Sequence, residues 1–188
     1  MKKISALVSS NEIGLIQLRD KHGTKTDILK FATKLVKCLA LTKTLLIIND
    51  YADVALAALA DGVHLGQEDF SIREARKVIG KDRIVGVTCH NLSEALKAQN
   101  EGADYIGIGP LYTTITKPGC PGIGLKAAAA LKAKIKIPYF AIGNIGEGNL
   151  GKITAAGIRR IAVCRSILDA GDPQQAAKRL HRLLGKVN

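Results

Sequence analysis

The chain has 188 residues, of which 47% are hydrophobic, and a formal net charge of +12. This length suits a single domain, residues 1–188, with a substantial core. No apolar run approaches the ~20 residues of a membrane span, and no signal-peptide pattern is present, so we expect a cytoplasmic protein without a membrane partner. The basic residues are dispersed and Trp is absent, which disfavours nucleic acid and leaves two interpretations of the charge, a solvated basic surface and, more specifically, a site for a phosphorylated small molecule.

Short apolar runs alternate with helix-like stretches along the chain. Continuous apolar strands that alternate with helices indicate a parallel sheet covered on its outer face. We therefore predict an α/β fold of the TIM-type (β/α)8 barrel class, in which polar groups at the carboxyl ends of the strands form one active site. The runs are residues 15–18, 45–48, 62–65, 84–87, 105–108, 139–142 and 161–163.

Helix signals lie between these runs. Residues 24–40 carry apolar side chains at helical spacing and open at a threonine that suits an N-cap. Asn91 followed by Glu94 resembles a capping box, and an aspartate directly before Pro173 is typical of the start of a helix.

The sequence offers seven strands where a closed barrel of this class has eight. The residues before Leu15 include Ile4, Leu7 and Val8, which fit a helical face better than a strand. We therefore expect the first strand of the barrel to be lacking. The resulting gap would expose strand edges, and either the N-terminal segment or a partner chain in a homo-oligomer would have to cover it.

Two acidic residues follow neighbouring strands. Asn49 and Asp50 end one strand, and Asp69 follows the next. Neighbouring strands lie ~4.8 Å apart, so two carboxylates at their ends can share one hard cation such as Mg²⁺. Each Asp taken alone fits a helix cap better than a metal ligand, with Asp50 serving the helix that follows it and Asp69 the helix near Ser71, but the two together, opposite basic groups, favour a metal site.

Basic side chains follow the run at 15–18. Gln17, Arg19 and Lys21 alternate, so with a period of two their side chains would share one face. A guanidinium fork and an ammonium point charge both suit phosphate oxygens. The alternative is an edge strand whose charges point to solvent.

Three later segments also follow strands. A turn at residues 113–117 supplies hydroxyl groups and Lys117, and its alternative is an ordinary turn whose threonines bond to local backbone. The segments 143–146 and 163–166 follow the last two strands, where backbone N–H groups commonly bind a phosphate. For these segments the alternative is a plain turn between strand and helix, in which the segment 143–146 uses a glycine for its backbone angles.

The cysteine and histidine residues give weaker signals. The four cysteines are widely spaced and are expected to stay reduced, with Cys38 and Cys164 as small buried residues. Cys89 lies at a strand end without any feature that marks a nucleophile. His64, within a strand, fits a core residue better than a catalyst, and no histidine pair suggests zinc.

Six stretches of the chain, in this order, resemble thiamine-phosphate synthases, and they span nearly the whole sequence. The resemblance implies a (β/α)8 barrel and a Mg²⁺-dependent transferase that joins 4-amino-5-hydroxymethyl-2-methylpyrimidine diphosphate to a thiazole phosphate and releases pyrophosphate. The stretches are QLRDK (17–21), IND (48–50), DGVHLGQED (61–69), GVTCH (86–90), GADYIGIGPLYTTITK (102–117) and AIGNI (141–145).

The resemblance also implies roles for individual residues. Asp50 and Asp69 would bind Mg²⁺, and Arg19, Lys21 and Lys117 would stabilise the departing pyrophosphate in a dissociative reaction. The residues that would hold the pyrimidine diphosphate are Gln17, Leu18, Arg19, Asp20, Lys21, Asn49, Thr88 and Lys117. Those that would hold the thiazole phosphate are Thr114, Ile115, Thr116, Asn144, Cys164 and Arg165.

The chain departs from the family pattern at several positions. Asn144 replaces a glycine, which a backbone phosphate contact tolerates if Asn adopts the required dihedral angles. Thr88, Cys164 and Arg165 stand where Ser, an aliphatic residue and Ser are common, and Arg165 would either add a phosphate contact or block it. Two other functions are kept open: a thiazole tautomerase, disfavoured because Asp69 and Pro110 are retained, and a non-catalytic thiamine-precursor binding protein.

Overall fold

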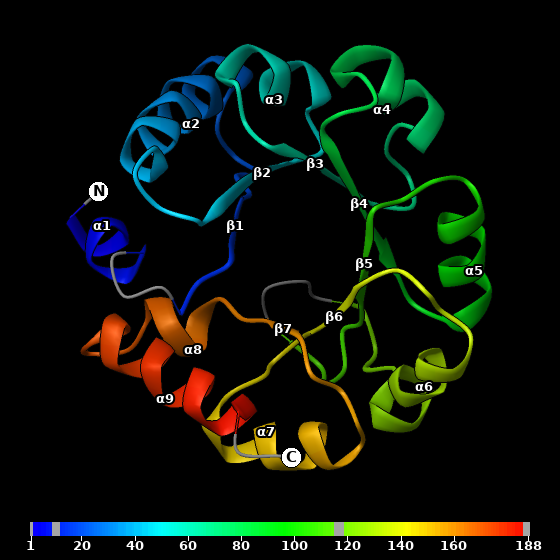
Figure 1. Ribbon diagram of the computed structural model, residues 1–188. Coiled ribbons are helices and arrows are strands. Elements are labelled where there is room, and N and C mark those ends of the chain that lie inside the picture. The colour runs from blue at the N-terminus through cyan, green and yellow to red at the C-terminus, as the bar shows by residue number, and fades with distance from the viewer. Residues whose placement is uncertain (1, 9–11, 115–118, 186–188) are drawn as a thin grey trace. The chain divides into compact units, whose positions relative to one another are not determined.

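The computed structural model describes residues 2–8, 12–114 and 119–185 (Figure 1). The chain forms two compact units, Met1–Val87 and Thr88–Asn188. The boundary falls inside strand β4 (Ile84–Cys89), which continues from one unit into the other. The expected single domain over residues 1–188 stays a prediction.

The first unit contains parallel strands β1 (Leu15–Leu18), β2 (Leu45–Asn49), β3 (Gly62–Leu65) and the start of β4. They pair in chain order, with Ile16 opposite Leu46 and Val63 opposite both Ile48 and Val85. Because all four run in one direction, their carboxyl ends lie along the same edge. The helices of this unit are α1 (Lys2–Val8), α2 (Lys25–Leu39), α3 (Ala52–Ala58) and α4 (Ile72–Ile79).

The helices of the first unit begin where local sequence signals place them. Thr24 caps α2 by accepting a hydrogen bond from the backbone N–H of Asp27 at 3.2 Å. Ser71 and Glu74 form a complete capping box at the start of α4. Helix α2 buries one stripe of side chains spaced three or four residues apart, which is the spacing of a single helical face. This stripe consists of Ile28, Ala32, Leu35 and Leu39.

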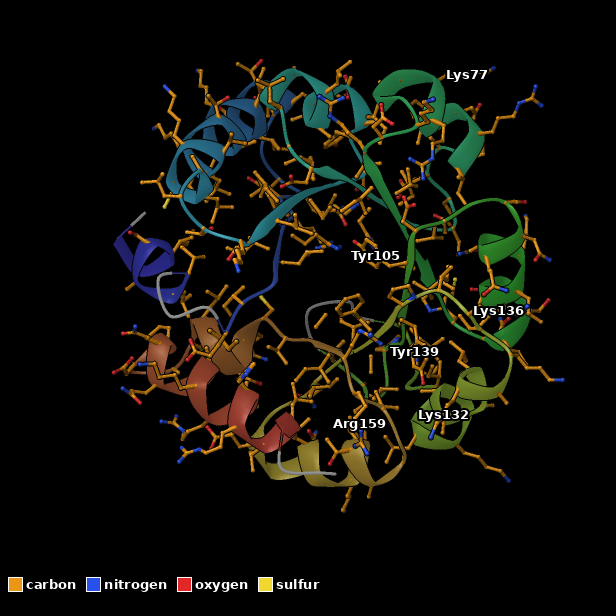
Figure 2. The ribbon with its side chains drawn as sticks, viewed as in Figure 1. Lys77, Tyr105, Lys132, Lys136, Tyr139 and Arg159 are labelled. Carbon is orange, nitrogen blue, oxygen red and sulfur yellow. The ribbon has the colours of Figure 1, made fainter. Side chains whose placement is uncertain are left out.

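The second unit contains the parallel strands β5 (Tyr105–Ile108), β6 (Tyr139–Ile142) and β7 (Ile161–Ala162). Figure 2 shows Tyr105 on β5 and Tyr139 on β6. The ring of Tyr105 packs edge-on against Phe140, with 5.5 Å between the ring centroids. The helices are α5 (Leu92–Asn100), α6 (Gly124–Ala130), the 3₁₀ turn η1 (Leu131–Ala133), α7 (Glu147–Ala155), α8 (Arg165–Leu168) and α9 (Pro173–Gly185).

Every predicted strand is present, with small changes at three ends, the first being the run 45–48, which extends to Asn49. The run 84–87 extends to Cys89, and the run 161–163 shortens to two residues. The segment before Leu15 is helical, as expected, and no strand precedes β1 among the described residues.

One helix start differs from the prediction. Asn91 caps α5 by accepting from the backbone N–H of Glu94 at 2.9 Å, but the expected capping box is only half formed. The Glu94 carboxylate instead accepts from the backbone N–H of His90, at 2.8 Å. In the described part of the chain, every helix is too short or too polar to cross a bilayer.

Candidate functional site

Asp50 directly follows strand β2 and is held in an unusual backbone conformation. Its φ of 66° is left-handed, a region that Asp tolerates better than most residues. Its backbone N–H donates to the carbonyl oxygen of His64 on β3 at 2.8 Å. These constraints fix the point from which the carboxylate projects, at the carboxyl edge of the sheet in the first unit.

The alternative that the two acids only cap helices is wrong. Helix α3 begins at Ala52, and its N-cap residue Tyr51 provides no side-chain cap, so Asp50 does not serve this helix. Helix α4 is capped by the hydroxyl of Ser71. Asp69 instead accepts from the backbone N–H of Gly66 at 2.6 Å, which holds the turn after β3.

The side chains of Lys21, Asp50 and Asp69 form a charged cluster. The Lys21 ammonium donates to Oδ2 of Asp50 and forms an ion pair with it. Burial raises the pKa of the Asp50 carboxyl above its usual value, Lys21 lowers it, and the hydrogen bond and charge of Asp69 raise it further. The Asp50 carboxyl group therefore lies close to the Asp69 carboxyl group, where burial and a like charge both disfavour its ionised form.

This donor set fits a hard divalent cation. Mg²⁺ typically takes one or two protein carboxylates and fills its remaining positions with water and phosphate oxygens. Asp50 and Asp69 supply such a pair, and within the described ranges no group of three or more His, Cys, Asp or Glu side chains is arranged to hold a metal ion. The two aspartates are the residues of this unit that would hold such an ion.

The residues after β1 behave differently from one another. The expected alternation of Gln17, Arg19 and Lys21 requires all three to lie on one strand. The strand ends at Leu18, so only Gln17 lies on it, and Arg19 and Lys21 belong to the segment that follows. Arg19 is exposed in the segment that follows. The carboxylate of Asp20 accepts from two backbone N–H groups, those of residues 22 and 23, each at 2.9 Å. Asp20 thus shapes the turn that carries Lys21.

In the second unit, Asn144 links two of the loops predicted to bind phosphate. Its φ of 49° confirms that Asn adopts the left-handed conformation expected where the family has a glycine. Its side-chain amide donates to the carbonyl oxygen of Thr113 at 3.2 Å, next to Thr114. The carbonyl oxygen of Asn144 accepts from Asn149 of α7 at 2.8 Å. Predicted residues Ile115, Thr116 and Lys117 lie outside the described residues.

Close packing beside this loop requires a glycine. A Cβ on Gly143, whose φ is 109°, would lie 2.5 Å from Cβ of Pro110. The loops after β5 and β6 can therefore approach one another only because position 143 lacks a side chain.

The other predicted residues of the second unit have varied surroundings. Thr88 is half-buried on β4. Arg165 is exposed and its Nε donates at 3.0 Å to Asp169, the C-cap residue of the short helix α8. The expectation that Cys164 is buried is wrong, because it precedes this one-turn helix, which leaves it at the surface, and Cys38 is half-buried.

Cys89 is fully buried at the end of β4. Burial raises the pKa of its thiol to about 12. At pH 8 only about one thiol in ten thousand would be ionised, so we expect Cys89 to resist a thiol reagent while exposed Cys164 reacts. Counting thiols modified by Ellman's reagent before and after unfolding, with Cys89→Ser and Cys164→Ser as matched variants, checks this. Fast loss of the Cys89 thiol in the folded protein would contradict it.

His64 is a buried residue that also positions Asp50, which the sequence did not indicate. The residue is 5% exposed, and burial lowers the pKa of its imidazole to about 4, against the opposing influence of Asp69. The imidazole is therefore neutral at physiological pH, as expected of a core residue. Its backbone carbonyl, however, anchors Asp50, a contact that the motif at 61–69 does not reveal.

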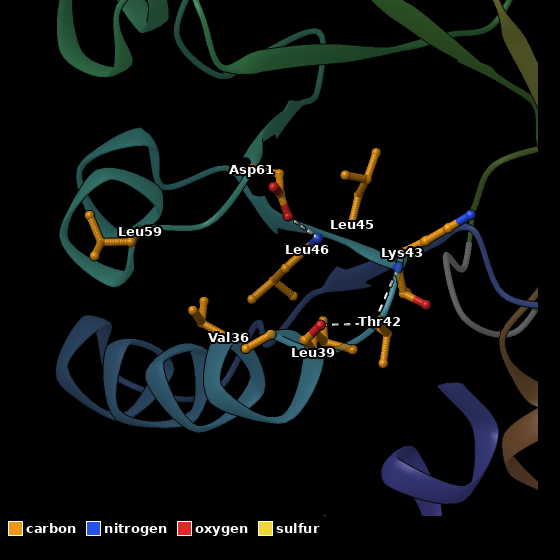
Figure 3. Close-up of a pocket in the computed structure, with 10 residues that line it drawn as sticks. Val36, Leu39, Thr42, Lys43, Leu45, Leu46, Leu59 and Asp61 are labelled. Atoms are coloured by element: carbon orange, nitrogen blue, oxygen red, sulfur yellow. Dashed lines mark hydrogen bonds between the residues drawn. The ribbon is translucent and has the colours of Figure 1, made fainter. Parts of the chain in front are cut away.

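A hollow of about 290 Å³ lies elsewhere in the first unit (Figure 3). It is bounded by the last turn of α2, the start of β2 and the segment after α3. Because it lies at the amino end of β2, it is separate from the charged cluster at the carboxyl end. Its lining includes Val36, Leu39, Thr42, Lys43, Leu45, Leu46, Leu59 and Asp61.

Parallel strands alternating with helices, with an acidic pair and Lys21 beyond their carboxyl ends, define a protein of the (β/α) enzyme class. A profile described as thiamine monophosphate synthase matches residues 1–167. The chain therefore belongs to the thiamine monophosphate synthase family.

Individual relatives agree with this assignment. A thiamine-phosphate synthase of Prochlorococcus marinus is 41% identical over 93% of this chain and 50% of its own length. That of Clostridium acetobutylicum is 40% identical over 93% of this chain and 82% of its own. The chain thus spans only half the length of the first relative and most of the second.

A solved structure supports the fold class. Thiamine phosphate pyrophosphorylase from Pyrococcus furiosus aligns with a TM-score of 0.88 and 31% identity, over 98% of this chain and 90% of that one. The predicted (β/α) barrel class is confirmed, and the described residues before β1 contain a helix and no strand.

Proposed function

We propose that the chain is a thiamine-phosphate synthase, a transferase that moves the aminopyrimidine methyl group from its diphosphate to a thiazole phosphate. The observation that carries this proposal is the family match together with the acidic pair and Lys21 at the strand ends. Relatives that share about 40% identity over 93% of the chain bear this name.

Positive charge at the leaving group is the main requirement of this reaction. The C–O bond to the diphosphate breaks with its electron pair leaving on oxygen, and the thiazole nitrogen then forms a bond to the carbon. Arg19, Lys21 and Lys117 would stabilise the departing pyrophosphate, because negative charge develops there in the transition state. No side-chain nucleophile is needed, which agrees with the buried, protonated thiol of Cys89.

Mg²⁺ is the cofactor that we propose. Asp50 and Asp69 would hold it, and the bound ion would supply positive charge to the diphosphate oxygens. Gln17, Leu18, Asn49 and Thr88 would contact the pyrimidine substrate, with Asp20 shaping the turn beside it.

The thiazole phosphate would be held by residues of the second unit. Thr114, Ile115 and Thr116 would contact it directly, and Asn144 fixes the neighbouring loop through the carbonyl of Thr113. Cys164 and Arg165 begin α8, and a phosphate contact from Arg165 would require its ion pair with Asp169 to open.

An assay with both substrates and Mg²⁺ tests the proposal. Formation of thiamine phosphate and pyrophosphate in stoichiometric amounts is the expected result. Isomerisation of a thiazole alone would favour a tautomerase, and substrate binding without turnover would favour a binding protein.

A further inference from the structure

Lys21 occupies the place beside Asp50 where a cation is needed. Its ammonium pairs with Oδ2 of Asp50, which lies 29 residues further along the chain. The Lys21 side chain is 44% exposed, whereas that of Asp50 is only 12% exposed. One partner of the ion pair is therefore fixed in the protein, and the other is on a flexible stem at the surface.

The two carboxylates, in contrast, cannot readily separate. Asp50 is held by its left-handed backbone and by the hydrogen bond from its N–H to His64. Asp69 is held by the N–H of Gly66 at 2.6 Å. Like charges at fixed positions require a counter-ion.

The charges of this cluster favour exchange of the Lys21 ammonium for a divalent cation. Two carboxylates and one ammonium, those of Asp50, Asp69 and Lys21, leave a net charge of −1. A divalent cation in place of the ammonium would make the acidic pair neutral and would release Lys21 with its charge available to an anion. A lysine serves this purpose better than an arginine, because its ammonium is a point charge on a flexible chain.

We propose that Lys21 is an exchangeable counter-ion: it neutralises Asp50 while the divalent cation is absent and turns to the diphosphate when the cation binds. The inference rests on the proposed function and assigns this exchange to its metal and diphosphate site. It makes Lys21 a competitor of the cation when diphosphate is absent and a partner of the cation when diphosphate is present.

Removing Lys21 should therefore change two affinities in opposite directions. In Lys21→Gln without diphosphate, Mn²⁺ should bind about tenfold more tightly than to the unmodified protein, because its competitor is gone. With Mn²⁺ saturating, inorganic pyrophosphate should bind about tenfold more weakly, because a phosphate contact is lost.

Electron paramagnetic resonance of free Mn²⁺ measures the first affinity and calorimetric titration the second. Lys25→Gln is the matched control, since Lys25 forms an exposed ion pair with Asp53 at 2.7 Å and should leave both values unchanged. Thermal unfolding verifies that each variant is folded.

A second measurement uses the unaltered chain. Mg²⁺ should increase the acetylation rate of the Lys21 amine severalfold, as read by mass spectrometry, while the rate at Lys25 stays constant.

The outcomes separate the inference from the proposed function. If Mn²⁺ bound equally tightly to Lys21→Gln and to the unmodified protein, the proposed exchange would be overturned. An acetylation rate of Lys21 that Mg²⁺ does not change would also overturn it. Either result would leave the proposed synthase activity unaffected. If no Mn²⁺ binds at all, the exchange fails together with the proposed Mg²⁺ site, and the substrate assay then decides on the synthase separately.

Discussion

Asp50→Asn is expected to lower the rate of thiamine phosphate formation at least about a hundredfold, roughly 2.7 kcal/mol of transition-state stabilisation. The amide keeps the size of the side chain and tolerates the left-handed φ of 66°, but it removes the charge that would hold the cation. Steady-state kinetics with both substrates measure the effect.

The same substitution should not destabilise the fold at neutral pH. Folding raises the pKa of Asp50, chiefly through burial, so the folded state holds the proton more tightly than the unfolded chain does. Its contribution to stability is therefore present in full below the unfolded pKa and is lost as the pH rises through the folded pKa. An uncharged amide avoids this loss at pH 7, and we expect thermal unfolding at an unchanged or higher temperature.

Asp53→Asn provides the matched control. Asp53 forms an exposed ion pair with Lys25 at 2.7 Å, so its removal should change neither activity nor stability appreciably. Full activity in Asp50→Asn would remove the acidic pair from the proposed mechanism.

Gly62→Ala is expected to destabilise the protein by about 3 kcal/mol. A Cβ at this position would lie 2.1 Å from the carbonyl oxygen of Ile84 on the neighbouring strand. Gly62 pairs with Ile47 on one side and Ile84 on the other, so β3 cannot move away from one neighbour without approaching the other. Chemical denaturation with a two-state analysis measures the change.

A glycine in open surroundings provides the opposite test. Gly151 lies within helix α7, and a Cβ there would meet no heavy atom within 4 Å. Gly151→Ala should therefore raise stability by about 0.5–1 kcal/mol, because alanine loses less conformational entropy in a helix. If Gly62→Ala and Gly151→Ala had equal free energies of unfolding, crowding between β3 and β4 would not determine the effect of a side chain at position 62.

The sequence by itself determined the order and direction of the elements. Short apolar runs such as 45–48 that alternate with helices are typical of strands in a covered parallel sheet, and caps such as Thr24 are decided by neighbouring residues, so both were predictable. The same holds for the position of Asp50 and Asp69 at strand ends.

Only the tertiary structure decided which contacts these side chains make. That Lys21 pairs with Asp50, that Asp69 bonds to Gly66 and that His64 anchors Asp50 depend on how turns from different strands approach one another. The prediction that Cys164 is buried was wrong for the same reason, since its exposure follows from the short helix after β7. Burial and side-chain pairing depend on packing between segments that are distant in the sequence. The spacing of residues along one segment therefore cannot predict them.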